Sequence, residues 1–226
     1  MVNYLLILSG LIITGTLLFY TAKYAYKYGL KLGDFLKNKV LTEQDRFTRI
    51  AELLFSEGKE SFLNDINKLK NLPLVFIQNH WQLFDNRGID EEYAEDFEML
   101  FKVVLEHHLK KSNNFLVIDY KHSGYDGLDS VNWLLNKNGI PPVPATEEEN
   151  LNRSIHHKYL DYASEDYLDT FDLLIHISNL IDQSGFTLIE LNFGGDSFDL
   201  FVLPKSKLPE VMGHFQKLKI DVMALK

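Results

Sequence analysis

The strongest structural signal in this chain is the stretch Phe186-Thr-Leu-Ile-Glu-Leu-Asn-Phe-Gly-Gly-Asp-Ser-Phe-Asp-Leu-Phe-Val-Leu203. Its two ends, 186–191 and 197–203, are rich in β-branched and aromatic residues, which favour extended strands. Between them, residues 192–196 combine two glycines with an asparagine and an aspartate, a composition typical of a tight turn. The stretch therefore predicts a β-hairpin, and its partial alternation allows one face of the hairpin to remain in water.

Working outward from the hairpin, the body of the chain mixes short apolar runs with helical patterns. Buried strands are predicted at 74–77 and 115–118, and an edge strand at 220–223. Helices are predicted at 42–54, 61–69, 90–111, 128–138, within 147–184 and at 208–218, and polar turns or loops at 85–88 and 119–127. The buried stripe of the 90–111 helix is expected to begin at Tyr93. Residues 40–226 thus predict a single α+β domain, with a mixed or antiparallel sheet of about four strands packed by helices.

The first 39 residues differ from this body in charge. They contain five lysines and one aspartate, a net charge of +4. The whole chain has 23 Lys and Arg and 32 Asp and Glu, so residues 40–226 have 18 and 31 of these and a net charge of −13. The formal charge of −9 therefore combines a basic head, residues 1–39, with a strongly acidic body.

The basic head includes an uncharged apolar run at 4–22. As a helix this run extends roughly 28 Å, about the thickness of the hydrocarbon core of a bilayer. It lacks the preceding positive charge of a cleaved signal peptide. We expect residues 1–39 to form a transmembrane helix followed by a basic juxtamembrane helix.

The lysines that follow the apolar run predict its orientation. Lys23, Lys27 and Lys31 lie directly after it, and no basic side chain lies before it. By the positive-inside rule, the N-terminus is expected outside and the C-terminal domain in the cytoplasm. The protein is thus predicted to contact the lipid bilayer as a single-pass membrane protein.

The composition also excludes several kinds of chemistry. The chain has no cysteine, so disulfides, thiolate metal sites and a cysteine nucleophile are excluded. The acidic body argues against a nucleic-acid partner, because phosphate backbones are bound by clustered Lys and Arg. Motifs of zinc proteases, phosphate-binding loops and nucleophile-elbow hydrolases are absent, and no cofactor is predicted.

The acidic residues gather in two regions, 85–98 and 147–172. One interpretation is ordinary solvated helix faces. The other is an acidic surface that attracts a basic protein partner, with tyrosines as interface anchors. The candidate binding residues are Glu91, Glu92, Glu95, Asp96, Tyr159, Tyr162, Asp166 and Tyr167.

Two further clusters are weaker candidates for chemistry. In the 119–129 loop, His122 with Asp126 or Asp129 has the composition of an acid–base pair, although turn and capping roles explain the same residues. In the 169–176 helix, Asp169, Asp172 and His176 have the i, i+3, i+7 spacing of metal ligands on one helix face. A structural Asp172–His176 pair explains the second cluster equally without a metal.

The carboxyl half carries a family resemblance. Segments 115–121, 129–135 and 186–204 occur in an order that resembles a group of uncharacterised bacterial α+β domains, some of which look like immunity proteins of toxin systems. The resemblance implies no catalytic residues. It implies, for some members, a role in inhibiting another protein.

These observations predict a membrane-tethered, non-enzymatic domain that binds a basic protein. An immunity-type inhibitor would be one instance, on the strength of the resemblance. Two alternatives remain open: a small membrane-bound hydrolase or metalloenzyme that uses the 119–129 loop or the 169–176 helix, and a scaffold subunit of a membrane complex.

Overall fold

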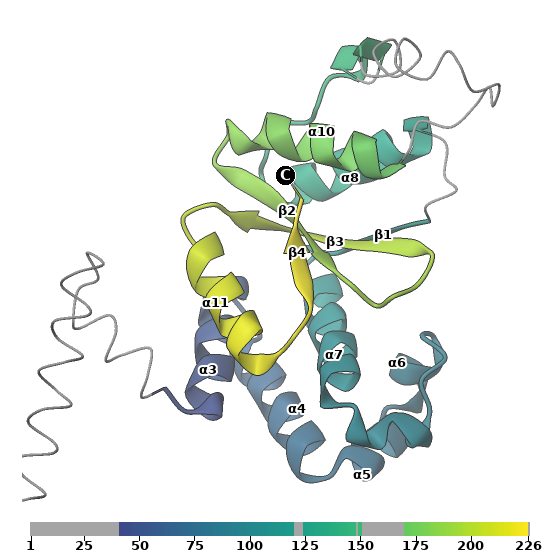
Figure 1. Cartoon of the computed structure of the whole chain (residues 1–226), viewed down its shortest axis with the longest axis vertical. Coiled ribbons are helices and arrows are strands. Elements are labelled where there is room, and N and C mark those ends of the chain that lie inside the picture. The colour runs from purple at the N-terminus through teal and green to yellow at the C-terminus, as the bar shows by residue number, and fades with distance from the viewer. Residues whose placement is uncertain (1–40, 120–123, 148, 151–169, 226) are drawn as a thin grey trace, which may run out of the picture. The chain divides into compact units, whose positions relative to one another are not determined.

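The computed structural model in Figure 1 describes residues 41–119, 124–147, 149–150 and 170–225. The chain divides into two units, 1–46 and 47–226, and the fold below is that of the second unit. The predicted membrane segment at 4–22 and the juxtamembrane lysines lie outside the described residues. No helix within the described ranges has both the length and the apolar character needed to cross a bilayer.

A four-stranded antiparallel sheet forms the centre of the second unit. Its strands are β1 (Leu116–Asp119), β2 (Phe186–Leu191), β3 (Ser197–Pro204) and β4 (Val222–Ala224). They are ordered β1-β3-β2-β4, and all three pairings are antiparallel. The predicted hairpin is therefore confirmed as the central β2–β3 pair, and the predicted edge strand is confirmed as β4.

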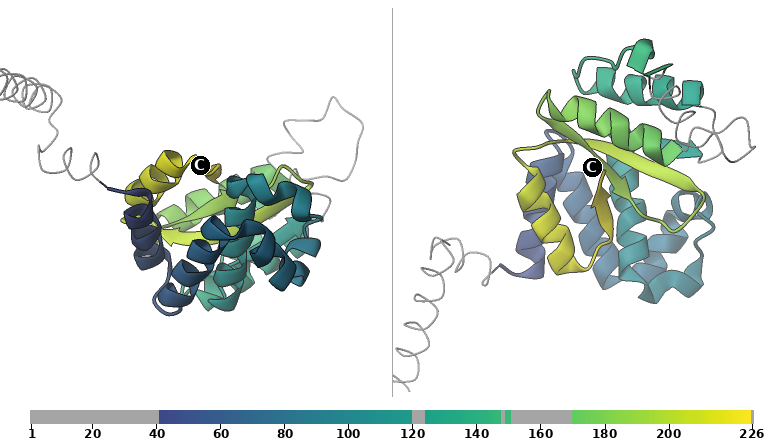
Figure 2. Two further views of the ribbon diagram at one scale, coloured as in Figure 1. Left: turned by 90° about the horizontal axis from the view of Figure 1, so that it is seen from below. Right: turned by 45° about the horizontal axis from the view of Figure 1, so that its top comes forward.

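Helices cover both faces of the sheet (Figures 1 and 2). One face packs against α8 (Gly124–Lys137) and α10 (Thr170–Asp182). On the opposite side lie α3 (Glu43–Leu54), α4 (Lys59–Asn71), α5 (Pro73–Asn79), α6 (Trp81–Asp85), the 3₁₀ helix η1 (Glu91–Glu95), α7 (Phe97–Lys111) and α11 (Leu208–Leu218). The result is a three-layer α/β/α arrangement, in which Figure 1 shows α5 at the lower end of α4 and α6 beside α7.

The sheet has a hydrophobic core on each of its faces, and these two cores explain why apolar and polar residues alternate only partly in the hairpin. Leu188 and Leu200 are buried against α8 and α10, whereas Ile189 and Phe201 belong to the core on the α7 side. Both faces of the hairpin are therefore apolar, and the suggestion of a water-facing side is wrong. A strand that is buried on both faces has a nearly continuous run of apolar residues in its sequence.

The predicted strand at 74–77 is also wrong, because these residues lie in helix α5. Pro73 occupies the first turn of this helix, where its missing N–H costs nothing. Phe76 and Ile77 are buried while Leu74 and Val75 are exposed. A four-residue apolar run fits one turn of a half-buried helix as well as it fits a strand.

The predicted 90–111 helix is divided in two by capping side chains. Asp90 accepts a hydrogen bond from the Glu92 N–H and starts η1. Asp96 accepts one from the Met99 N–H at 3.0 Å and starts α7. Because an Asp cap needs extended or irregular backbone at its own position, Asp96 interrupts the helical run. Tyr93 consequently lies on η1, where its side chain is exposed instead of buried.

Candidate functional site

The two weaker candidate clusters for chemistry are only partly within the described residues. Asp129 is exposed on α8, and Asp126 belongs to the first turn of the same helix, so part of the predicted polar loop is helical. His122 lies outside the described residues. The structure therefore does not test an acid–base pair at this position.

The candidate metal ligands are similarly divided. His176 is half-buried on α10, with its Nε2 3.5 Å from Oε2 of Glu147. Asp172 lies on the same helix, and Asp169 is outside the described residues. No group of three or more potential metal ligands is present in the described part of the chain. The Glu147 contact is a pairing for His176 that sequence spacing did not indicate.

The candidate binding residues of the first acidic region are all described, and they lie together. Glu91, Glu92 and Glu95 are on η1, and Asp96 follows as the cap of α7; all four are exposed. Gln78 of α5 donates a hydrogen bond to the Glu91 carboxylate at 3.0 Å. The candidates of the second region, Tyr159, Tyr162, Asp166 and Tyr167, lie outside the described residues.

Exposed apolar side chains accompany the first acidic region. Of the eight large hydrophobic residues that are exposed in the described part of the chain, five lie between residues 72 and 93. They are Leu72, Leu74, Val75, Trp81 and Tyr93, and the exposed fractions of Leu72 and Trp81 reach 58% and 56%. We call α5, α6, η1 and their connections the 72–96 surface. Such a concentration of exposed apolar side chains is typical of an interaction site.

This surface is supported by a packed core beneath it. Phe76, Ile77, Phe84 and Ile89 come from the same segment and are buried. The rings of Phe76 and Phe84 meet edge to face, with centroids 6.1 Å apart. The exposed side chains therefore project from a segment with its own buried anchors, which limits the entropy lost when a partner binds.

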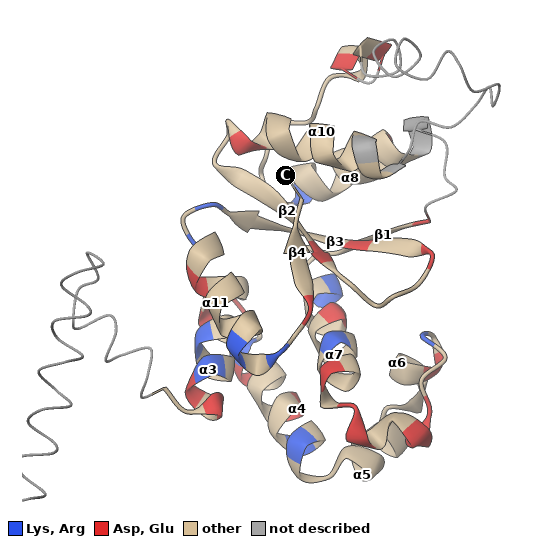
Figure 3. Ribbon diagram, in the orientation of Figure 1, with Lys and Arg blue, Asp and Glu red and all other residues tan. Residues whose placement is uncertain are grey.

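The charge of the 72–96 surface is strongly negative. The segment contains six acidic side chains and a single basic one, Arg87. Figure 3 shows acidic residues on η1 and at the start of α7. All six acids are exposed.

Arg87 does not neutralise these acids, because it points into the protein. The turn at 85–88 ends at Gly88, which has a φ of 64°, a left-handed conformation that glycine adopts readily. From this turn the guanidinium donates to Glu106 at 2.8 Å and also to Asp199 of β3. It lies over the ring of Phe193 as well, 4.3 Å from the centroid. The single basic side chain of residues 72–96 thus pairs with buried acids of the interior and not with the exposed acids of the surface.

Burial makes the largest contribution to the pKa of both Arg87 and Asp199, but it sets the direction of the net shift only for Asp199. Burial lowers the pKa of Arg87, but hydrogen bonds to Glu106 and Asp199 outweigh it and leave that pKa raised. Burial raises the pKa of Asp199, and its hydrogen bond with Arg87 offsets only part of this. The desolvated carboxylate therefore depends on Arg87 to remain charged.

Arg87 belongs to a larger network of ion pairs, partly buried, that sequence analysis missed. Glu98, Lys102, Glu106 and Lys110 recur every four residues on one side of α7, with Lys102–Glu98 and Lys110–Glu106 ion pairs of 2.7 and 2.5 Å. Lys102 also donates to the backbone oxygen of Asn192 in the hairpin turn. The alternation of acidic and basic residues at intervals of four could have indicated these ion pairs from the sequence. The network joins the 72–96 surface, α7 and the hairpin.

Two hollows adjoin these elements. One, of about 280 Å³, lies between the start of α7 and the hairpin turn. Its polar groups are already paired, because Asn192 donates to Asp221 and the Asp221 N–H donates to Glu98, both at 2.9 Å. This pairing favours a structural role for the first hollow.

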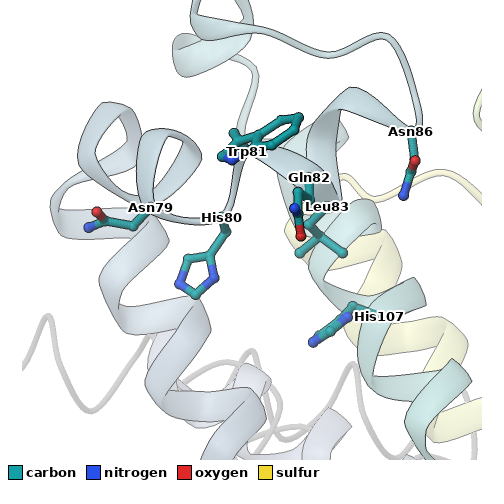
Figure 4. Close-up of a pocket in the computed structure, with 7 residues that line it drawn as sticks. All are labelled: Asn79, His80, Trp81, Gln82, Leu83, Asn86 and His107. Carbon is teal, nitrogen blue, oxygen red and sulfur yellow. The ribbon is translucent and has the colours of Figure 1, made fainter.

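The second hollow, which we call the Trp81 hollow, has a volume of about 360 Å³ and belongs to the 72–96 surface (Figure 4). It is lined by Asn79, His80, Trp81, Gln82, Leu83, Asn86 and His107. The imidazoles of His80 and His107 extend from two different elements, and the His80 ring lies against that of Phe76 at a centroid distance of 4.4 Å. Burial lowers the pKa of His107, and Lys111 and His108 lower it further.

Comparison with protein-family models assigns the body of the chain. The model described as "Domain of unknown function (DUF6630)" matches residues 46–225. The chain belongs to this family. The DUF6630 match includes the 72–96 surface and the sheet, and it agrees with the predicted resemblance to a group of uncharacterised domains. Comparisons with curated proteins and with solved structures found no match.

Proposed function

We propose that this DUF6630 domain is a non-enzymatic protein-binding module that captures a basic protein through the 72–96 surface. The observation that carries the proposal is the combination of exposed apolar side chains with exposed carboxylates on one internally packed segment. Residues 4–22 would hold the module at the membrane, with its body in the cytoplasm. An immunity-type inhibitor is the specific instance that the sequence resemblance suggests.

The chemistry of protein interfaces supports this choice. Interface centres are enriched in aromatic residues, and charged side chains surround them. Trp81 and Tyr93 have the character of such anchors, and Glu91, Glu92 and Glu95 that of an acidic rim. A negative rim accelerates the approach of a positively charged partner and makes the association rate sensitive to salt.

The alternative enzyme and scaffold functions have less support. Asp126 and Asp129 lie on a helix instead of a loop, and His176 contacts Glu147 without needing a metal. No observation on the described residues favours a scaffold role. Both alternatives remain hypotheses that the metal content of the purified protein and deletion of residues 1–30 would test.

Site-specific photocrosslinking tests the proposed function. A benzophenone amino acid placed at Tyr93 or Val75 in the full chain, expressed in its native host, is expected to crosslink a basic protein. The matched control is the same amino acid at Trp133, an exposed aromatic residue on α8. Crosslinking at Trp133 alone, or to acidic partners only, would contradict the proposal.

The membrane arrangement needs a separate measurement. A reporter fused after Lys226 is expected to be active only in the cytoplasm, and alkaline washing should leave the protein in the membrane pellet. A reporter active only outside the cytoplasm would contradict the predicted orientation. Release of the protein by alkali would contradict the predicted transmembrane anchor.

A further inference from the structure

We infer that the Trp81 hollow receives an arginine side chain of the basic partner. This inference rests on the proposed function and deepens it, because it names the residue type that the 72–96 surface recognises. Three observations carry it: the hydrogen-bonding groups that line the hollow, the exposed indole of Trp81 and the negative charge of the 72–96 segment around the hollow.

The lining offers acceptors that suit a guanidinium group. Asn79, Gln82 and Asn86 each carry an amide carbonyl, and an imidazole such as that of His80 or His107 has one acceptor nitrogen whenever it is neutral. A guanidinium has five N–H donors and no acceptor. A hollow of about 360 Å³ is large enough for one side chain from a partner surface.

Trp81 favours arginine over lysine. Its side chain is 56% exposed, so its indole is accessible to a partner. A planar guanidinium stacks on an aromatic face as well as attracting its electrons, whereas an ammonium group acts only as a point charge. Trp and Arg are also among the residues that contribute most to binding at protein interfaces.

The lining of the hollow has no acidic side chain, so the negative charge that would attract a cation comes from the rest of the 72–96 segment. The segment that forms most of the hollow has six acids, and its one arginine is held by Glu106 and Asp199. His107 comes from α7; burial favours its neutral form, as do the charges of Lys111, His108 and His80, while Asp65 opposes them. Acidification that protonates His107 should therefore weaken binding of a cation.

A fluorescence titration tests this inference directly. The chain has two tryptophans, so Trp133→Phe leaves Trp81 as the sole indole of the full-length protein in detergent. An acetylated and amidated tetra-arginine peptide is expected to change the Trp81 emission saturably, and to bind about fivefold more tightly than tetra-lysine. Equal affinity for the two peptides, or a preference for tetra-glutamate, would overturn the assignment of arginine.

Charge substitutions distinguish the hollow from the surrounding acids. Asn86→Lys is expected to weaken tetra-arginine binding about tenfold, because it adds a cation at the wall of the hollow. The matched control, Gln183→Lys, adds the same charge at an exposed position after α10 and should change binding little. Gln82→Glu should strengthen binding, because it adds a negative charge at the wall of the hollow. This second variant tests the inference even if Asn86→Lys does not fold.

The outcomes also separate this inference from the proposed function. If both lysine variants weaken the peptide equally while neutralising Glu91, Glu92 and Glu95 abolishes binding, the hollow is not the arginine site but the acidic rim still binds cations. If tetra-arginine does not bind at all, the inference fails. The proposed function is then judged by crosslinking at Tyr93 and Val75, which does not depend on arginine.

Discussion

Two consecutive regions of the chain contain similar charged residues but use them differently. On α7, Glu98, Lys102, Glu106 and Lys110 alternate in sign and pair with one another, with Lys102 and Glu106 buried. In residues 85–96, six acids are exposed, and Trp81 and Tyr93 of the same surface are exposed as well. The first region holds the helices to the hairpin, and the second is available to a partner. The acidity of the body is therefore not one property, because only its exposed part can attract another molecule.

The largest expected effect is on the buried network. Arg87→Ala should reduce the free energy of unfolding by about 3–5 kcal/mol, because it leaves Asp199 buried without its counter-ion. Denaturant unfolding of the full chain in detergent measures this. Arg49→Ala is the matched control: Arg49 is 45% exposed and pairs with Glu52 and Glu210, so its loss should cost no more than about 1 kcal/mol. Equal losses would remove the distinction between the two regions.

The next effect concerns the exposed acids. Combined Glu91→Gln, Glu92→Gln and Glu95→Gln substitutions should lower the crosslinking yield at Tyr93 about tenfold and reduce its salt dependence, with little change in stability. The control variant replaces three exposed acids elsewhere: Glu57→Gln, Asp129→Asn and Asp196→Asn. An equal loss in the control would show that net charge, and not the 72–96 surface, attracts the partner.

Asp96 belongs to both regions and therefore sharpens the comparison. Asp96→Ala should lower the free energy of unfolding by about 1 kcal/mol, because it removes the cap that accepts the Met99 N–H. Glu95→Ala, one residue earlier and exposed, should change stability much less. If both variants keep the wild-type midpoint of denaturant unfolding, Asp96 acts at the surface only.

The smallest expected effect is a pH dependence from Glu190. Burial raises the pKa of this carboxyl group on β2, with help from Asp199 and Asp221, and its buried Oε2 has no hydrogen-bond partner among the residues that the structure describes. The folded-state pKa thus exceeds the unfolded value, so stability falls as pH rises from the unfolded pKa through the folded one. Glu190→Gln should remove this decline and raise the melting temperature at pH 7 by about 2 °C. Melting curves at pH 4 and pH 7 test it, since a benefit of the same size at both values would rule out titration of Glu190.

Local patterns were sufficient for the elements whose own residues specify them. The hairpin is encoded by its turn residues and flanking strand formers, and the 208–218 helix by its amphipathic spacing, so both appear at the predicted positions. The four candidate binding residues of the first acidic region lie together on the surface, while their role as an interface stays a prediction. The charge contrast between residues 1–39 and the body is likewise a property of composition alone.

The tertiary structure determined which residues are buried, and with them the character of each region. Asp199 and Glu92 are both acidic, yet Asp199 is buried and pairs with Arg87, which lies 112 residues away in sequence, whereas Glu92 is exposed. Leu74 and Val75 look like core residues until the packing of Phe76 and Ile77 leaves them outside. Propensity and periodicity act over a few residues, whereas burial is set by contacts between distant segments. For that reason the exposed apolar side chains, the Trp81 hollow and the inward turn of Arg87 became visible only in the folded chain.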